Sequence, residues 1–166
     1  MLKIRGRSLE KSFEENIIKY QEAYYRLAFS YVKNEYDAKD ILQESILKAY
    51  KNISKLKDID ALDKWMKRII VNTALDFIRK NSKVSLTIND NEVIDIPSKE
   101  KNNELIYIID NLDPELKTII ILKYYHGYTI EEVADILEIS ISMVKNRMHK
   151  ALKLLRVEIK DGEKVE

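Results

Sequence analysis

Residues 129–156, TIEEVADILEISISMVKNRMHKALKLLR, carry two apolar patterns at helical spacing with a very short break between them. Apolar residues that recur every three or four positions lie on one face of a helix. The apolar positions are Ile130, Val133, Ala134 and Leu137 in the first pattern and Val144, Met148, Ala151, Leu152 and Leu155 in the second. The stretch therefore predicts a helix-turn-helix, and Ser140 or Ser142 is expected to cap its second helix.

The second of these helices has a basic face opposite its apolar stripe. From Met143 to Lys160, six Lys or Arg stand against Glu158 alone. Lys, Arg and amide side chains donate hydrogen bonds to phosphates and to purine edges in a major groove. We interpret this face as a DNA-binding surface; a solvated basic helix packed on its neighbour is the alternative. Glu138 stands at the turn where Gly is common, so a left-handed backbone there would be strained.

The composition favours an all-α protein, because only three Gly and two Pro interrupt 166 residues that are 45% hydrophobic. There is no Cys, and the two His are far apart, so we expect no disulfide, no metal site and no cofactor. No apolar run has the length of a membrane span, and the N-terminus lacks the apolar core of a signal peptide. We therefore expect a cytoplasmic protein that does not insert into membranes.

The sequence also lacks a recognisable catalytic arrangement. It contains no Gly-rich phosphate loop and no Cys nucleophile, and no Ser, His and Asp have a spacing that supports a triad. A non-enzymatic role is the better hypothesis.

The first half of the chain predicts a small helical domain at residues 12–82. Residues 1–11 are basic and lack periodicity, so they are expected to form a loose arm. Helices are expected at residues 13–32, 35–53 and about 61–79. A single Trp on an apolar helix face, here Trp65, is more often a core residue than a stacking platform.

A linker and a second small domain follow. The stretch from Ser82 to Pro97 loses helical periodicity and gathers Asn, Asp and Ser, so residues 83–100 are predicted to be a flexible linker. The second domain is expected at residues 101–160, with a tail at 161–166. Its helices are predicted at residues 103–112, at 115–125 after an Asp113 cap, and in the helix-turn-helix, where Thr129 and Glu132 form a capping box.

Charge is unevenly distributed, although the formal net charge is only +1. Residues 35–47 carry four acidic side chains against one Lys, whereas residues 64–83 carry six Lys or Arg against one Asp. An acidic segment ahead of two basic ones suits a protein that holds DNA with some surfaces and another protein with a different one.

Three blocks of sequence resemble a known family in both content and order. They are YRLAFSYVKNEYDAKDILQESILKAYKNI, then WMKRIIVNTALDFIRK, and then LDPELKTIIILKYYHGYTIEEVADILEISISMVKNRMHKALKLLR. Together they resemble the extracytoplasmic-function sigma factors of bacteria, which belong to the sigma-70 family, and in detail the branch that includes the lysozyme-responsive members. The resemblance covers nearly the whole chain.

This resemblance implies an alternative sigma factor that binds core RNA polymerase, recognises the −35 and −10 promoter elements and promotes DNA melting. The first domain corresponds to sigma region 2 and the second to sigma region 4, and the implied polymerase contacts are the β′ clamp and the β flap. The family's clamp-binding motif has the form DAxDxxQE. Its polar positions fall here on Asp37, Asp40, Gln43 and Glu44.

The resemblance also implies two sets of promoter contacts. The −10 set consists of Lys64, Trp65, Arg68, Asn72, Arg79 and Lys80, with Asn72 on an unpaired base, and the loop from Lys57 to Asp63 is implied to capture a flipped base. The −35 set consists of Thr129, Ser142, Lys145, Asn146, Arg147, His149 and Lys150. Glu138 in place of the usual turn Gly, and Met143 where Thr is common, depart from the family pattern at the turn and at the start of the second helix.

Members of this family are usually inhibited by an anti-sigma factor, often membrane-anchored, so such a partner is also implied. Two alternatives remain open from the sequence. One is a stand-alone helix-turn-helix regulator that binds duplex operators, with the N-terminal helices as a dimerisation module. The other is a polymerase-binding or anti-sigma-type adaptor that never reads bases.

Overall fold

The computed structural model describes residues 2–88 and 107–162, and the side chains of residues 8–81 and 107–156. Every regular element in these ranges is helical, which confirms the all-α prediction. The chain divides into two compact units, residues 1–88 and 89–166. Within the described ranges, no helix combines the length and the apolar character needed to cross a membrane.

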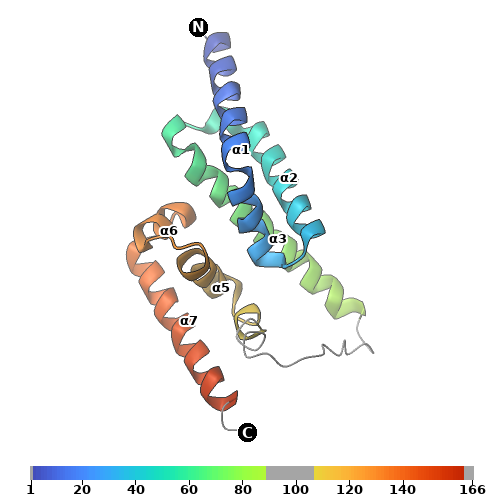
Figure 1. The fold of residues 1–166 in the computed structure, drawn as a ribbon, viewed down its shortest axis with the longest axis vertical. Coiled ribbons are helices and arrows are strands. Elements are labelled where there is room, and N and C mark those ends of the chain that lie inside the picture. Colours follow the sequence, from blue (N-terminus) through green and yellow to red (C-terminus); the bar gives the residue numbers. More distant parts are fainter. Residues whose placement is uncertain (1, 89–106, 163–166) are drawn as a thin grey trace. The chain divides into compact units, whose positions relative to one another are not determined.

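Unit 1 is built from three long helices that pack against one another (Figure 1). They are α1 (Leu2–Val32), α2 (Glu35–Asn52) and α3 (Leu62–Ile88). Each is amphipathic, and the apolar stripes meet in a core that contains the fully buried Tyr24, Leu27, Ile41, Met66 and Ile70. Burial of this apolar area is the main contribution to the stability of the unit.

Tight connections join these helices. Between α1 and α2, Lys33 adopts a left-handed conformation with φ 59°. Asn34 then caps α2, since its Oδ1 accepts a hydrogen bond from the Asp37 backbone N–H at 2.8 Å. Between α2 and α3 lie two single 3₁₀ turns, η1 (Ile53–Lys55) and η2 (Ile59–Ala61).

Unit 2 contains α5 (Pro114–Ile120), the π-helical turn η3 (Ile121–Tyr125), α6 (Ile130–Leu137) and α7 (Ile141–Gly162). A helical turn at residues 107–110 precedes them. It is joined to α5 by an ion pair between Asp110 and the largely buried Lys117, with 2.7 Å between Oδ1 and Nζ. The buried residues that hold α5 against α7 are Leu116, Ile120, Ala151 and Leu155.

The helix starts in unit 2 follow the sequence closely. Asp113 caps α5 by accepting a hydrogen bond from the Glu115 N–H at 3.0 Å. Thr129 and Glu132 form the predicted capping box of α6, with bonds of 3.1 and 2.8 Å. Ser140 caps α7 through the Met143 N–H at 3.1 Å, which resolves the choice between Ser140 and Ser142.

The turn of the helix-turn-helix confirms the expected strain. Glu138 lies in the left-handed region with φ 51° and ψ 46°, a conformation that Gly adopts without steric cost. We predict that Glu138→Gly raises the free energy of unfolding of unit 2 by about 0.5–1 kcal/mol. Thermal denaturation measures this. Glu138→Ala is the control, since it removes the carboxylate but keeps Cβ; a gain as large with Ala as with Gly would contradict the explanation.

Two predicted boundaries are wrong. The basic segment at 1–11 is not an irregular arm, because α1 already begins at Leu2. Its Leu, Lys, Arg and Glu residues favour helix, and extending a helix costs less than starting one, although no apolar face marks the segment. Helix α3 also runs on to Ile88, although Ser, Val, Thr and Ile near its end are weak helix formers, because extending a helix costs less than starting one. The predicted linker therefore begins later than residue 83. The rest of that linker, and residues 163–166 of the predicted tail, lie outside the described residues.

Candidate nucleic-acid and protein interfaces

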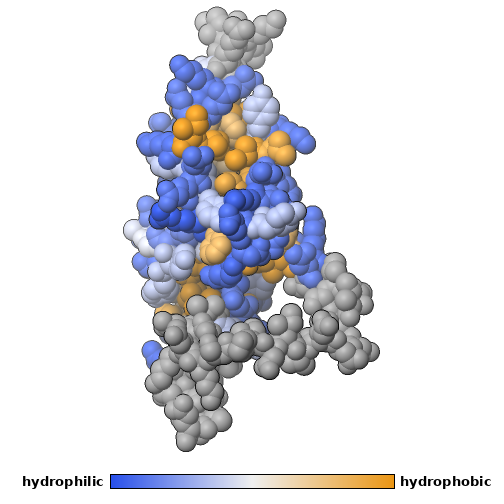
Figure 2. All heavy atoms as spheres, turned by 45° about the vertical axis from the view of Figure 1, so that its right-hand side comes forward, coloured by the Kyte–Doolittle hydropathy of each residue, from blue (hydrophilic) through white to orange (hydrophobic). Residues whose placement is uncertain are grey.

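The outer face of α2 combines polar residues with large exposed apolar ones. Alternating steps of four and three residues place Tyr36, Asp40, Gln43, Leu47 and Tyr50 in one stripe. Tyr36 is 76% exposed, Leu47 59% and Tyr50 51%. The space-filling view of one side of the molecule likewise shows apolar residues open among hydrophilic ones (Figure 2). A stripe that is apolar at both ends and polar in the middle is typical of a protein-binding face.

The other two predicted polymerase contacts flank this stripe and already have partners. Asp37 accepts a hydrogen bond from Asn34 Nδ2 at 2.6 Å, so its carboxylate belongs to the start of the helix. Glu44 pairs with Lys48, with 2.7 Å between oxygen and nitrogen. The sequence interpretation found the acidic motif but missed the exposed apolar residues beside it, which stand four or seven positions from the motif's own residues.

A further pair lies on the opposite flank of α2. Lys39 donates a hydrogen bond to Glu35, and this bond lowers the pKa of the Glu35 carboxyl and raises the pKa of the Lys39 ammonium. Each group therefore stays charged over a wider pH range. The charge of Lys39 is balanced within the helix, which leaves the stripe and its flank at Asp37 acidic.

Four of the six predicted −10 contacts share one face of α3. At about 100° per residue, Trp65, Arg68, Asn72 and Arg79 fall within an arc of about 60°. Asn72 and Arg79 are exposed, whereas Trp65 and Arg68 are half-buried. Arg79 also pairs with Asp76, with 3.3 Å between Nη1 and Oδ1. The remaining two, Lys64 and Lys80, are exposed and flank this face.

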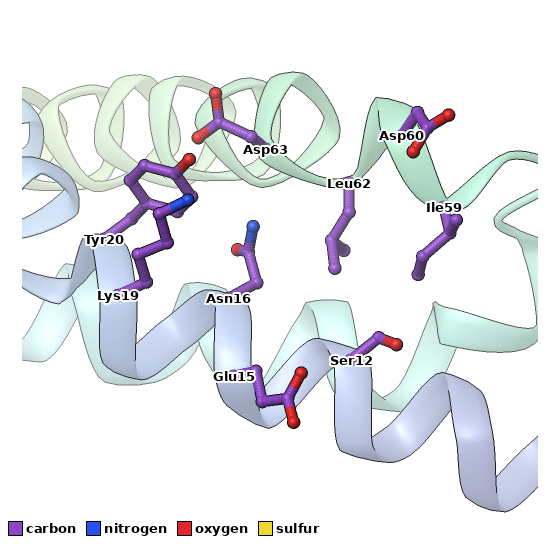
Figure 3. Close-up of a pocket in the computed structure, with 9 residues that line it drawn as sticks. All are labelled: Ser12, Glu15, Asn16, Lys19, Tyr20, Ile59, Asp60, Leu62 and Asp63. Carbon is purple, nitrogen blue, oxygen red and sulfur yellow. The ribbon is translucent and has the colours of Figure 1, made fainter.

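The loop from Lys57 to Asp63 lies directly ahead of this helix. Asp58 caps η2 by accepting a hydrogen bond from the Asp60 N–H at 3.0 Å. A shallow pocket of about 280 Å³ separates the end of the loop from α1 (Figure 3). Nine positions separate Asp63 from Asn72, so the two side chains leave α3 on opposite sides. The pocket is therefore not next to Asn72.

The outer face of α7 gathers most of the predicted −35 contacts. Ser142, Lys145, Asn146 and His149 are all exposed and lie within an arc of about 100°, with Lys150 exposed at its edge. Because Ser140 forms the cap, the hydroxyl of Ser142 is not used at the helix start. The face presents hydroxyl, ammonium, amide and imidazole groups, which suit phosphates and base edges.

The structure separates Arg147 and Thr129 from this group. Arg147 Nη2 lies 2.7 Å from Glu115 Oε2, and its side chain is only 25% exposed, so it ties α7 to α5. Thr129 Oγ1 accepts the hydrogen bond that caps α6. The helical pattern already places Arg147 at the edge of the buried stripe, but charge alone does not reveal that a carboxylate on another helix pairs with it.

Comparison with known protein families identifies the class of protein that carries these surfaces. Residues 17–84 match the family model for sigma-70 region 2, and residues 102–155 match the one for sigma-70 region 4. The RNA polymerase sigma factor SigV of Bacillus subtilis is 39% identical over 148 residues, which cover 86% of this chain and 88% of SigV. The chain is a sigma factor of the sigma-70 family. It is thus a transcription initiation factor of the extracytoplasmic-function group and not a stand-alone regulator.

The similarity extends to other sigma factors. The extracytoplasmic-function sigma factor SigW of Bacillus subtilis is 28% identical, across 97% of this chain and 98% of its own length. Among solved structures, the sigma factor RpoE of Bartonella quintana, crystallised with the anti-sigma factor NepR, aligns with TM-score 0.66 and 21% identity over 90% of this chain and 98% of RpoE. CnrH, in complex with the cytosolic domain of CnrY, aligns with TM-score 0.65 and 20% identity over 92% and 90% of the two chains. These two structures support the fold.

Proposed function

We propose that the three exposed faces of this sigma factor have separate roles: α2 binds the polymerase, α3 opens the −10 element and α7 recognises the −35 element. The observation that carries this proposal is that the predicted residues group on three separate helix faces with different chemistry. The α2 face is acidic and apolar, whereas the α3 and α7 faces are basic and each carries one Asn amide.

On α2, the polymerase contact would centre on Asp40 and Gln43, with Tyr36 and Leu47 packing at either side. Basic groups of the β′ clamp would meet the acidic centre, and apolar groups would cover the exposed Tyr and Leu. Asp37 and Glu44 would contribute mainly through their charge, because both carboxylates have partners within the helix. The β flap would bind unit 2.

On α3, Asn72 would hydrogen-bond an unpaired base of the −10 element, while Trp65 offers an aromatic edge beside it. Arg68, Arg79 and the flanking Lys64 and Lys80 would hold the phosphates of the separated strand. The free energy that opens the DNA then comes from binding, and no nucleotide hydrolysis is needed. We accordingly assign no catalytic chemistry to this chain.

On α7, Lys145, Asn146 and His149 would contact bases or phosphates of the −35 element in the major groove. Ser142 and Lys150 would add backbone contacts at the two sides. Arg147 would act by holding α7 on α5, because its guanidinium is paired with Glu115.

We also propose that an anti-sigma factor regulates this protein and that this inhibitor is membrane-anchored. The complex of RpoE, which shares the fold, with the anti-sigma factor NepR supports the proposal of such a partner. The sigma factor itself would act in the cytoplasm, because its target is promoter DNA on the chromosome.

The proposal for α3 is tested with Asn72→Ala. We expect about a tenfold or greater loss of open complexes on duplex promoters, because a base contact is worth about 1–3 kcal/mol. Permanganate reactivity of unpaired thymines in the −10 element measures this. On a template with a premelted −10 element, whose thymines react with permanganate in any case, the yield of run-off transcript is measured instead, and it should recover most of the loss. Equal losses on both templates would contradict a role in strand opening.

A further inference from the structure

A polar cluster joins α1 to the start of α3 inside unit 1. The hydroxyl of the fully buried Tyr24 lies 2.7 Å from Asn16 Oδ1 and 3.0 Å from Asp63 Oδ1. The second carboxylate oxygen of Asp63 accepts a hydrogen bond from Lys67 Nζ at 2.6 Å. The Asp63 and Lys67 side chains are only 30% and 16% exposed, so water shields this pair incompletely.

The phenol of Tyr24 is held in its protonated, hydrogen-donating form. Burial, and then the charge of the Asp63 carboxylate, raise the pKa of this phenol far above its ordinary value. The Asp63 carboxylate therefore accepts one hydrogen bond from α1, from Tyr24, and one from α3 itself, from Lys67. Loss of either donor, or of the carboxylate, would leave a shielded polar group without its partner.

The position of Asp63 connects this cluster to both the loop and the start of α3. It is the second residue of α3, the helix that follows η2 directly. Leu62 is buried beside it, but the pocket between η2 and α1 leaves the rest of this side of the loop open (Figure 3). In Figure 3, Asn16 points from α1 into the space below the start of α3. Besides the packing of Leu62, the polar cluster is therefore a tie between α1 and the point where the loop joins α3.

The cluster cannot itself contact DNA that lies on the Asn72 face, because Asp63 leaves α3 on the opposite side. We infer that Tyr24 and Asp63 are positioning residues for promoter opening, which fix the loop at residues 57–61 and the first turn of α3 before DNA binds. This inference rests on the proposed function of α3. Groups that are held in place before binding lose less free energy when they engage their target.

Two variants test the inference. Tyr24→Phe removes only the hydroxyl, and Asp63→Asn removes the charge that pairs with Lys67. We expect each to lower open-complex formation on a duplex promoter about tenfold, as small misplacements in a preorganised site do. Affinity for core polymerase should stay unchanged, and a premelted −10 template should recover most of the loss.

Tyr25→Phe and Glu15→Gln are the matched controls. They make the same chemical changes on α1, at a half-buried Tyr that packs on Phe29 and at an exposed Glu at the edge of the pocket, and should open promoters like the unaltered protein. Thermal denaturation of every variant establishes the folded fraction at the assay temperature. Tyr24→Phe keeps the buried ring and so tests the inference even where Asp63→Asn unfolds.

Three results would overturn the inference: normal opening by both variants, equal losses on duplex and premelted templates, or losses that follow the unfolded fraction. Failure of the proposed function is distinguishable from these, because the unaltered protein would then form no open complex on any promoter.

Discussion

Asp40→Lys combined with Leu47→Glu should abolish assembly of this sigma factor with core polymerase. The first change reverses the charge at the centre of the α2 stripe, and the second places a carboxylate where an exposed apolar side chain would be covered. Losses at central interface residues are about 2 kcal/mol or more each, so we expect affinity to fall on the order of 100-fold or more. Fluorescence titration of labelled protein with core polymerase measures the change.

The control for this prediction is Glu14→Lys with Ile18→Glu on α1. Glu14 is exposed and Ile18 is 72% exposed, so the charge change and the type of surface are matched. This control should bind core polymerase normally, and both double variants should keep their helical circular dichroism. An equal loss of affinity in the two proteins would show that net charge, and not the α2 stripe, determines binding.

A large loss of preference for the −35 element is expected when Lys145→Ala is combined with Asn146→Ala on α7. Both side chains are exposed on the face away from the buried Val144, Ala151 and Leu155, so their removal leaves the core intact. Each lost base contact should cost about 1–3 kcal/mol, and the holoenzyme should lose most of its preference for the −35 element. Competition between promoters with an intact and a scrambled −35 element measures the preference.

Arg147→Gln provides the comparison for this prediction. It removes one positive charge from the same helix, but from the side that pairs with Glu115. We expect a loss of stability of at most about 1 kcal/mol, as for other partly exposed ion pairs, with the −35 preference retained. A loss of preference as large as that of the double variant would place Arg147 among the DNA contacts after all.

The sequence predicted most of the fold because its signals are local. Helical periodicity marked most of the buried faces of the long helices, although Leu152, which was placed in the apolar stripe of α7, is 37% exposed. The caps at Asp113 and Thr129 gave helix starts that the structure confirms. The strain at Glu138 was also evident, because a non-Gly residue stood in a turn that favours a left-handed backbone. Helix ends were less predictable: Leu2 and Ile88 lie beyond any apolar stripe, where the low cost of extending an existing helix, and not a pattern of buried residues, determines where the helix ends.

The candidate sites were predictable only to the extent that their residues share one helix. The spacing of Asp40 and Gln43, and that of Lys145, Asn146 and His149, already implied common faces. Contacts between helices carry no such signal. The pairing of Arg147 with Glu115, and the cluster of Tyr24 with Asp63, join residues that are 32 and 39 positions apart, and only the packed structure brings them together.

Run-off transcription with purified core polymerase tests the central claim most directly. The template carries the region upstream of the protein's own gene, either intact or with the −35 or the −10 element scrambled. We predict a discrete transcript from the intact promoter only when core polymerase and this sigma factor are both present, and its loss when either element is scrambled. A transcript that survives scrambling of one element would contradict the assignment of one promoter element to each unit.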